Sequence, residues 1–157
     1  MQELFDTLPQ IGQIEWIGLR PEKRAALKEV QEVEVTEKEG LVGDHYSGRS
    51  GKRQVTLIQK EHLDGVANIL KIDSIDPGLT RRNIVVSGIN LLALKDRKFK
   101  IGDVELEMTG ICHPCSRMEE NFGPGGYNAM RGHGGINAKV LKGGTISVGD
   151  EVKLLVD

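Results

Sequence analysis

The sequence predicts a mostly β domain with a few helices, in which the strands form a closed or partly closed barrel. Apolar residues alternate with polar or small residues in several short segments, as they do in strands with one buried face. One segment, residues 59–70, carries a clear helical face instead. Residues 99–108 and 146–155 share an apolar–Gly–Asp–strand pattern. Short, mostly antiparallel strands of this kind are typical of a barrel.

The first half of the chain contains the expected strands and the helix. Residues 11–19 and 32–40 alternate apolar and polar side chains, and residues 53–58 are rich in β-branched side chains, as in a buried strand. A further short strand is expected at residues 83–86. The helix is expected over residues 59–70, because its apolar residues fall at i, i+3, i+4 and i+7, namely Leu63, Val66, Ala67 and Leu70.

The second half adds more strands. Residues 99–108 and 146–155 are each expected to form two strands joined at a Gly-Asp corner. Between them, residues 136–144 alternate, with Ile136, Ala138 and Val140 on one face. No change in composition marks a domain boundary, so we predict one domain over residues 1–157. A chain of this length buries a core without the help of disulfides or metal.

Composition and charge exclude several classes of function. Charged residues make up 28% of the chain and hydrophobic residues 38%, as in globular proteins. The net charge of −2 offers no global field to hold nucleic acid. No apolar run is long enough to span a membrane, so no membrane partner is expected. Residues 1–10 lack the basic start and apolar stretch of a secretory signal, so a cytoplasmic location is expected.

Both cysteines of the chain, Cys112 and Cys115, lie in the segment TGICHPCSRMEE at residues 109–120. Ser116 and Glu119 match a capping box, which predicts a short helix that starts there. Cys115 would then lie at the helix N-terminus, where the backbone N–H groups favour a thiolate, with His113 and Arg117 as possible supporting charges. Cys112 would lie at a strand end and be less activated.

Other interpretations of the two cysteines remain open at this point. Both could be small buried apolar residues in a loop. They could form a thioredoxin-like redox pair, although such pairs belong near an early βα junction and this one lies late in a β-rich chain. A disulfide is not expected in a cytoplasmic chain. A zinc site would need four ligands, which His45 and His133 could complete, but the spacing matches no known finger.

Arginines and glycines point to an anionic ligand near the cysteines. Arg53, Arg82 and Arg131 stand beside expected strands or within glycine-rich loops, and guanidinium groups with glycine-rich backbone amides are what a phosphate-bearing ligand needs. We predict that these arginines line one cleft together with Cys115. His45 stands on the loop GLVGDHYSG with Asp44 and Tyr46, where its imidazole could act as an acid, a base or a hydrogen-bond donor. His62 is expected on the surface of the helix.

Five segments in this order resemble the MOSC domain, the C-terminal domain of molybdenum cofactor sulfurases, and in particular its small stand-alone bacterial members. The resemblance covers roughly residues 14–155 and is carried by GLVGDHY, RQVTLI, TRRNIVVSGINL, KIGDVELEMTGICHPCSRMEE and GGYNAMRGHGGINAKVLKGGTISVGDEV. It implies a β-barrel-like fold and a cysteine that binds molybdenum or carries a transferable sulfur. The extra N-terminal barrel and the sulfurase domain of longer members have no counterpart in the match.

Residue by residue, the resemblance assigns the metal-binding or sulfur-binding role to Cys115 and not to Cys112. It implies a catalytic role for Cys115 and the loop histidine His45. The residues that it implies in cofactor binding are Arg53, Arg82 and Asn83. The glycine-rich loop adds Arg131, His133 and Gly134 as further candidates for cofactor binding.

The expected function is therefore that of a protein that binds the molybdenum cofactor, molybdopterin, and reduces N-hydroxylated compounds. A soft metal accepts a protein thiolate, and the cofactor's phosphate accounts for the arginines. Electrons would come from a partner reductase, because the chain has no flavin or nicotinamide fingerprint and no set of four cysteines for an iron–sulfur cluster. The alternative is a sulfur carrier that receives a persulfide on Cys115 from a cysteine desulfurase. Pyridoxal phosphate is not expected, because no lysine stands in a convincing cofactor context.

Overall fold

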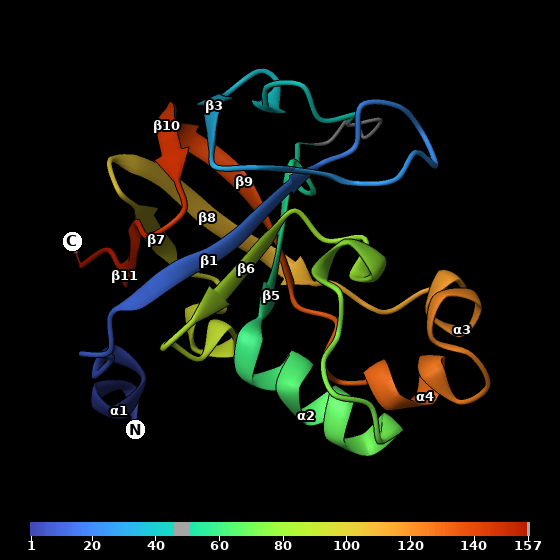
Figure 1. The fold of residues 1–157 in the computed structure, drawn as a ribbon. Helices are drawn as coiled ribbons and strands as arrows, with labels where there is room; N and C mark the ends of the chain where they lie inside the picture. Colours follow the sequence, from blue (N-terminus) through green and yellow to red (C-terminus); the bar gives the residue numbers. More distant parts are fainter. Residues whose placement is uncertain (46–50, 157) are drawn as a thin grey trace.

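The computed structural model describes residues 1–45 and 51–156, and its central feature is a closed barrel of seven strands (Figure 1). The strands follow the order β11-β7-β8-β9-β5-β6-β1, and β1 pairs with β11 to close the ring. All neighbouring pairs of the ring are antiparallel except β5 and β6, which are parallel. The bounds are β1 (Gly12–Leu19), β5 (Val55–Gln59), β6 (Ile84–Ser87), β7 (Lys98–Ile101), β8 (Val104–Ile111), β9 (Ile136–Lys142) and β11 (Glu151–Leu154). The expected mostly β, barrel-like fold is thus confirmed.

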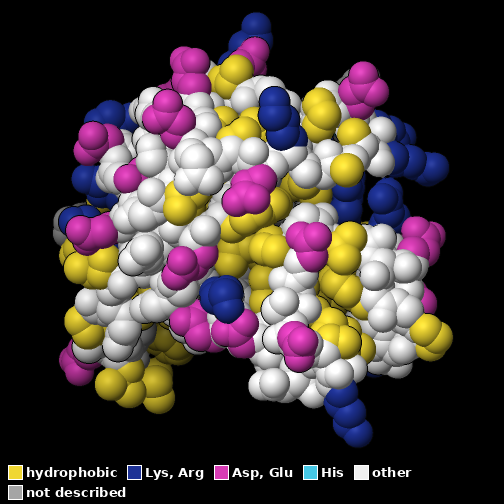
Figure 2. Space-filling view, in the orientation of Figure 1, with side chains coloured by type: hydrophobic (Ala, Val, Ile, Leu, Met, Phe, Trp, Pro, Cys, Tyr) yellow, Lys and Arg dark blue, Asp and Glu magenta, His cyan; other side chains and the backbone are white. Residues whose placement is uncertain are grey.

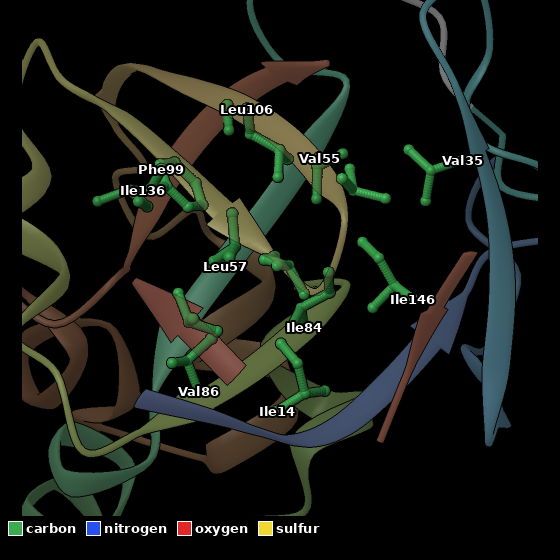
Figure 3. Packing of buried hydrophobic residues seen from close by; sticks show 14 of the residues in the cluster. Ile14, Val35, Val55, Leu57, Ile84, Val86, Phe99, Leu106, Ile136 and Ile146 are labelled. Atoms are coloured by element: carbon green, nitrogen blue, oxygen red, sulfur yellow. The ribbon is translucent and has the colours of Figure 1, made fainter. Parts of the chain in front are cut away.

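A small second sheet packs over one end of the barrel. It has the order β10-β3-β4, with β3 (Glu32–Thr36), β4 (Gly40–Leu41) and β10 (Gly144–Ser147). Val35 and Ile146 of this sheet belong to the same apolar cluster as the barrel interior (Figure 3). One further strand, β2 (Lys28–Val30), pairs with β1 outside the ring.

Helices cover one side of the barrel, because β5 and β6 are apolar on both faces. Leu57 points into the barrel cluster, whereas the next residue, Ile58, packs outward in a second cluster with Val66 of α2. The helices are α2 (Lys60–Leu70), α3 (Arg117–Phe122) and α4 (Gly126–Met130), with α1 (Gln2–Asp6) at the N-terminus and the 3₁₀ turns η1 (Pro77–Thr80) and η2 (Leu91–Leu94). The predicted helix is confirmed as α2, and its predicted apolar face is the one that packs on the barrel.

The two Gly-Asp corners both join strands, as predicted, but they do so in different ways. At Gly102 and Asp103, β7 turns back into β8 and the two strands form a hairpin. At Gly149 and Asp150 the chain passes instead from β10 of the small sheet into β11 of the barrel. The corner is fixed by hydrogen bonds with β1, because Gly149 N donates to Ile14 O and Ile14 N donates to Asp150 O. In the part of the chain that the structure describes, no helix is long and apolar enough to cross a membrane.

Candidate functional site

The two cysteines lie on the segment that leaves the barrel at the end of β8 and enters α3. Cys112 is buried, with 1% of its surface exposed, whereas Cys115 is exposed. Both are free thiols. Cys115 directly precedes Ser116, the N-cap residue of α3, and its carbonyl oxygen accepts a hydrogen bond from Met118 N. The predicted helix is therefore confirmed, as are the predicted positions of Cys112 at a strand end and of Cys115 at a helix start.

The capping box at Ser116 is wrong. Ser116 has helical backbone angles and its side chain makes no capping hydrogen bond, because an N-cap side chain reaches the helix N–H groups only from an extended backbone. The carboxylate of Glu119 instead accepts hydrogen bonds from the backbone N–H groups of Gly125 and Tyr127, both at 3.0 Å. These bonds lower the pKa of Glu119. Glu119 therefore ties α3 to the start of α4 and does not cap its own helix.

A glycine pair holds the cysteine segment close against the barrel. A Cβ atom at Gly134 would collide with the carbonyl oxygen of Cys112, and one at Gly135 would collide with the carbonyl oxygen of Leu57. Cys112 N donates to Gly135 O at 2.8 Å, which fixes this approach. Only residues without a side chain allow the two backbones to lie this close. Gly134, which was expected as a cofactor-binding residue, thus has a definite structural role.

The side chain of Arg82 holds the same segment through hydrogen bonds to backbone carbonyl oxygens. Its side chain is almost fully buried, at 5% exposure. Nε donates to Gly134 O at 2.7 Å and Nη2 donates to His113 O at 2.9 Å, while Nη1 donates to Thr80 O at 3.3 Å. The planar guanidinium can make these divergent bonds at once, which an ammonium group cannot do. The buried charge therefore positions the segment between the two cysteines.

The charge of Arg82 also acts on the sulfur atoms. Burial lowers the pKa of Arg82, and the thiols of Cys112 and Cys115 act in the opposite direction. Arg53 and Arg20 are near enough to lower it further. Arg53 Nη2 lies 3.9 Å from the Sγ atom of Cys112. Arg53 and Arg82, two of the three arginines predicted to line one cleft with Cys115, therefore lie near the cysteine segment, but the contact of Arg53 is with Cys112.

A second group of arginines centres on Arg81, which lies within electrostatic reach of Cys115. Burial lowers the pKa of Arg81, and the cationic Arg117 and Arg20 lower it further. Cys115 and Asp44 have the opposite effect. Mutual repulsion of this kind is relieved when an anion binds between the cations. A negatively charged ligand between these cations would relieve this repulsion, which Asp44 and Glu120 already reduce by pairing with Arg20 and Arg117.

Arg81 and Arg117 also line a surface cleft of about 380 Å³, whose wall includes Arg24 and Trp16. Figure 2 shows Lys and Arg side chains gathered along the right-hand edge of the molecule, between the connection that follows β1 and helix α3. The basic surface is local, because the net charge of the chain is only −2.

Asp44 is the centre of a buried hydrogen-bond network that includes Arg20 and Asn83. Its side chain is 1% exposed and forms an ion pair with Arg20 at 3.3 Å. Its carboxylate also accepts hydrogen bonds from Arg20 N and Asn83 Nδ2. Asn83 Nδ2 donates to Gly18 O as well, and Asn83 Oδ1 accepts from the N–H and hydroxyl groups of Thr56. The amide of Asn83 is thus used within the protein, and we revise its expected role from ligand contact to support of Asp44.

The remaining predicted residues lie around this centre. His45 is exposed. Its backbone N–H group donates a hydrogen bond to Arg20 O at 2.6 Å, so the loop that carries His45 is fixed to the backbone of Arg20. Tyr46 lies outside the described residues. Arg131 is exposed at the end of α4, and its guanidinium contacts Asn128. Among the residues that the structure describes, no contact joins Arg131 to Cys115.

His133 faces α2. Its ring packs edge to face against His62 at 5.0 Å between centroids, and its Nδ1 atom is buried without a hydrogen-bond partner. His62 was expected on the surface, but it is half-buried because its ring meets His133 across the groove between α2 and the glycine-rich loop. The described residues contain no group of three or more His, Cys, Asp or Glu side chains that could hold a metal ion, which speaks against the zinc interpretation.

Arg20 was not selected from the sequence, and Asp44 was noted only as a neighbour of His45, whereas Arg117 was expected as a supporting charge near Cys115. Arg81 looks like an ordinary surface charge beside the selected Arg82. Arg20 and Asp44 are 24 positions apart, and nothing in the spacing shows that they pair. The available signal was the pair of glycines that precedes Asp44, Gly40 and Gly43, which both adopt positive φ values in the turn before it.

Comparisons with known proteins agree with this architecture. A family model described as the MOSC domain matches residues 29–153. No curated protein matches the sequence. The crystal structure of the YuaD protein from Bacillus subtilis has a TM-score of 0.78 at 19% identity, and the match covers 92% of this chain and 95% of that one. The crystal structure of YiiM from Geobacillus stearothermophilus has a TM-score of 0.72 at 18% identity, and the match covers 92% of this chain and 75% of that one. The crystal structure of YiiM from Escherichia coli has a TM-score of 0.69 at 18% identity, and the match covers 92% of this chain and 70% of that one. At these identities the similarity is one of fold.

Proposed function

Because this chain belongs to the MOSC domain family, which is associated with binding of the molybdenum cofactor, we propose that it binds this cofactor through Cys115 and reduces N-hydroxylated compounds. The observation that carries the proposal is the exposed, free thiol of Cys115 beside arginines that repel one another. A soft metal favours a thiolate ligand, and the phosphate of the cofactor favours guanidinium groups. The cysteine segment and the arginines near it offer both a thiol and guanidinium groups.

The residues present fit the cofactor. Cys115 would hold the metal, because it is the exposed thiol of the pair, whereas Cys112 is buried under Arg53. Arg53, Arg81 and Arg117 would hold the anionic part, since none of them is fully committed to backbone acceptors in the way that Arg82 is. Arg82 would position the cysteine segment.

The reaction requires two electrons and two protons for each N–O bond that is broken, with water as the second product. The bound cofactor supplies a metal centre that can exchange two electrons with such a substrate. The electrons would come from a partner reductase. Among the residues of the chain, the exposed imidazole of His45 is the candidate that holds a proton near the site, because its backbone is fixed to Arg20 of the arginine network.

The second candidate function is sulfur transport. A persulfide on Cys115 would carry sulfur received from a cysteine desulfurase, and no small molecule would be reduced. The observation that favours it is the same exposed thiol, which lies within electrostatic reach of Arg81 and Arg82. The two functions differ in their metal content.

The test measures molybdenum and activity in matched cysteine variants. Protein made in a host that produces the cofactor is analysed for bound molybdenum, then assayed with a chemical electron donor and an N-hydroxylated base. We expect molybdenum and reduction in the wild type and in Cys112→Ser, and the loss of both in Cys115→Ser. Wild-type protein without molybdenum or reductase activity, which accepts a persulfide on Cys115 from a desulfurase, would establish the carrier function. Equal loss in both variants, with a reversible disulfide, would exclude both proposals.

A further inference from the structure

A cavity of about 290 Å³ lies on the α2 side of the cysteine segment, away from the arginines. It is partly enclosed between the start of α2, the turn η2, the cysteine segment and the glycine-rich loop before β9. Its apolar wall is formed by Leu91, Leu92, Ile111 and Pro114. Cys112 to Pro114 form one side, so the segment that carries the cysteines separates the cavity from the arginine network.

The cavity has no formal charge in its wall. None of its lining residues is a Lys, Arg, Asp or Glu. Arg82 lies behind the wall, where it donates to the carbonyl oxygens of His113 and Gly134, and Arg53 lies 3.9 Å from the Sγ atom of Cys112. A charged ligand would lose its hydration in such a cavity without gaining a partner. The cavity therefore favours an uncharged occupant.

The shape of the wall favours a flat occupant. Gly132, Gly134 and Gly135 line one side, so bare peptide groups face the cavity there instead of side chains. The volume is at the small end of the range for ligand pockets, about 300–1,000 Å³, and suits a molecule of one or two rings. A flat ring can lie against a wall of peptide groups with little loss of contact.

One polar group in the wall can select the occupant. The ring of His62 lines the cavity, and among the described residues it has no hydrogen-bond partner; it packs against the ring of His133. Burial lowers the pKa of His62, and His133 lowers it further, while Glu61 has the opposite effect. The imidazole is therefore favoured in its neutral form, in which one nitrogen accepts a hydrogen bond.

We propose that this cavity is a binding site for a small, flat, uncharged molecule with one hydrogen-bond donor, which the imidazole of His62 accepts. The site is separate from the anion site at the arginines. The cysteine segment and Gly134, whose carbonyl oxygen binds Arg82, lie between the two. This inference goes beyond the proposed function, because it holds whether the protein reduces a substrate or carries sulfur.

The experiment compares two probes of the same shape. Indole has an N–H donor, and benzofuran has an ether oxygen in its place. Binding to the full chain is followed by NMR through the backbone amides of Gly132, Gly134 and Gly135. Both probes are expected to shift these amides in a saturable way, with a dissociation constant for indole on the order of 1 mM or tighter. Indole should bind several-fold more tightly than benzofuran. Failure of both probes to saturate would overturn the proposal.

Two variants and a matched control test the position of the site. Leu92 is 42% exposed at the cavity rim, so Leu92→Trp fills the cavity without opening the core and should weaken both probes at least tenfold. Ile69 is 59% exposed on α2 and does not line the cavity, so Ile69→Trp should leave both affinities unchanged. His62→Phe keeps the ring that packs on His133 and should remove only the preference for indole. Unchanged binding in Leu92→Trp, or a retained preference in His62→Phe, would contradict the assignment.

The separation of the two sites is tested with inorganic phosphate as the second probe. Phosphate should bind with the same affinity in the presence and absence of saturating indole. Competition between the two would show that they share one site and would overturn the proposal. The probes contain no reducible N–O bond and the protein needs no molybdenum, so the outcome does not depend on the reductase function. Loss of molybdenum binding in Cys115→Ser would test the proposed function alone, because it would leave the binding of indole to the cavity undecided.

Discussion

Arg82 Nη2 donates a hydrogen bond of 2.9 Å to the carbonyl oxygen of His113, so a buried charge holds the residue that stands between the two cysteines. The same guanidinium holds Gly134 O and Thr80 O. A side chain that at first looks like a phosphate ligand is therefore also a structural element of the fold. Its replacement should affect stability before it affects binding.

Replacement of Arg82 by lysine should lower the free energy of unfolding by about 2–4 kcal/mol, because an ammonium group keeps the charge but cannot satisfy three divergent carbonyl oxygens. Urea denaturation measures the change. Arg131→Lys is the matched control, since Arg131 is exposed, and it should alter stability by less than about 0.5 kcal/mol. Wild-type stability in Arg82→Lys would show that the three bonds contribute little.

Gly134→Ala should destabilise the protein by about 1–3 kcal/mol, because the added methyl group collides with the carbonyl oxygen of Cys112 and pushes the cysteine segment outward. The buried thiol of Cys112 should then react faster with a thiol reagent. Gly110→Ala is the control, since no atom lies within 4 Å of its added Cβ. A slow, unchanged reaction of Cys112 in Gly134→Ala would mean that the segment moves as a rigid unit or does not move.

Asp44→Asn should have two opposite effects. The buried pair with Arg20 loses its negative charge, which should cost about 2 kcal/mol of stability. At the same time the repulsion among the remaining cations grows, so inorganic phosphate should bind several-fold more tightly at low salt, and this gain should shrink as salt is added. Denaturation and phosphate titration measure the two effects. Weaker phosphate binding in Asp44→Asn would place the anion outside the field of Asp44.

Glu119→Gln should reduce the dependence of stability on acid pH. The N–H groups of Tyr127 and Gly125 lower the pKa of Glu119 in the folded protein, so the folded state favours the carboxylate. This stabilisation is present above the unfolded value of 4.5 and is lost as the pH falls through the folded value. The wild type should therefore lose stability below about pH 4.5 more steeply than the variant. Glu22→Gln, an exposed control, should follow the wild type.

Much of the fold could be predicted because apolar spacing reports directly on burial. The face of α2 formed by Leu63, Val66 and Ala67 is the buried face, and Ile136 and Ala138 of β9 face the barrel. The parallel pairing of β5 with β6 could not be predicted, since strand pairing depends on partners far apart in sequence. For the same reason the second Gly-Asp corner gave no sign that its strands belong to different sheets.

The parts of the candidate site that depend on local sequence position could be predicted, whereas the parts that depend on tertiary contacts could not. The difference between Cys112 and Cys115 followed from their places at a strand end and a helix start. The capping box failed because Glu119 has better partners on α4 than on its own helix, and a local motif cannot show such partners. Arg20 was missed because its pairing with Asp44 exists only in the folded chain.

The closure of the barrel by β1 and β11 has a consequence for how the protein acquires its structure. Gly12 and Gln13 pair with Val152 and Glu151, so the last edges of the ring come from opposite ends of the described chain. Contacts between such distant segments form slowly, because the chain entropy lost on closing a long loop comes before the contacts that offset it. Until β11 docks, β1 and β7 present unpaired backbone groups next to apolar interior residues. During synthesis the protein therefore passes through a stage in which it can pair with other chains, and this stage ends only when residues 151–154 have left the ribosome.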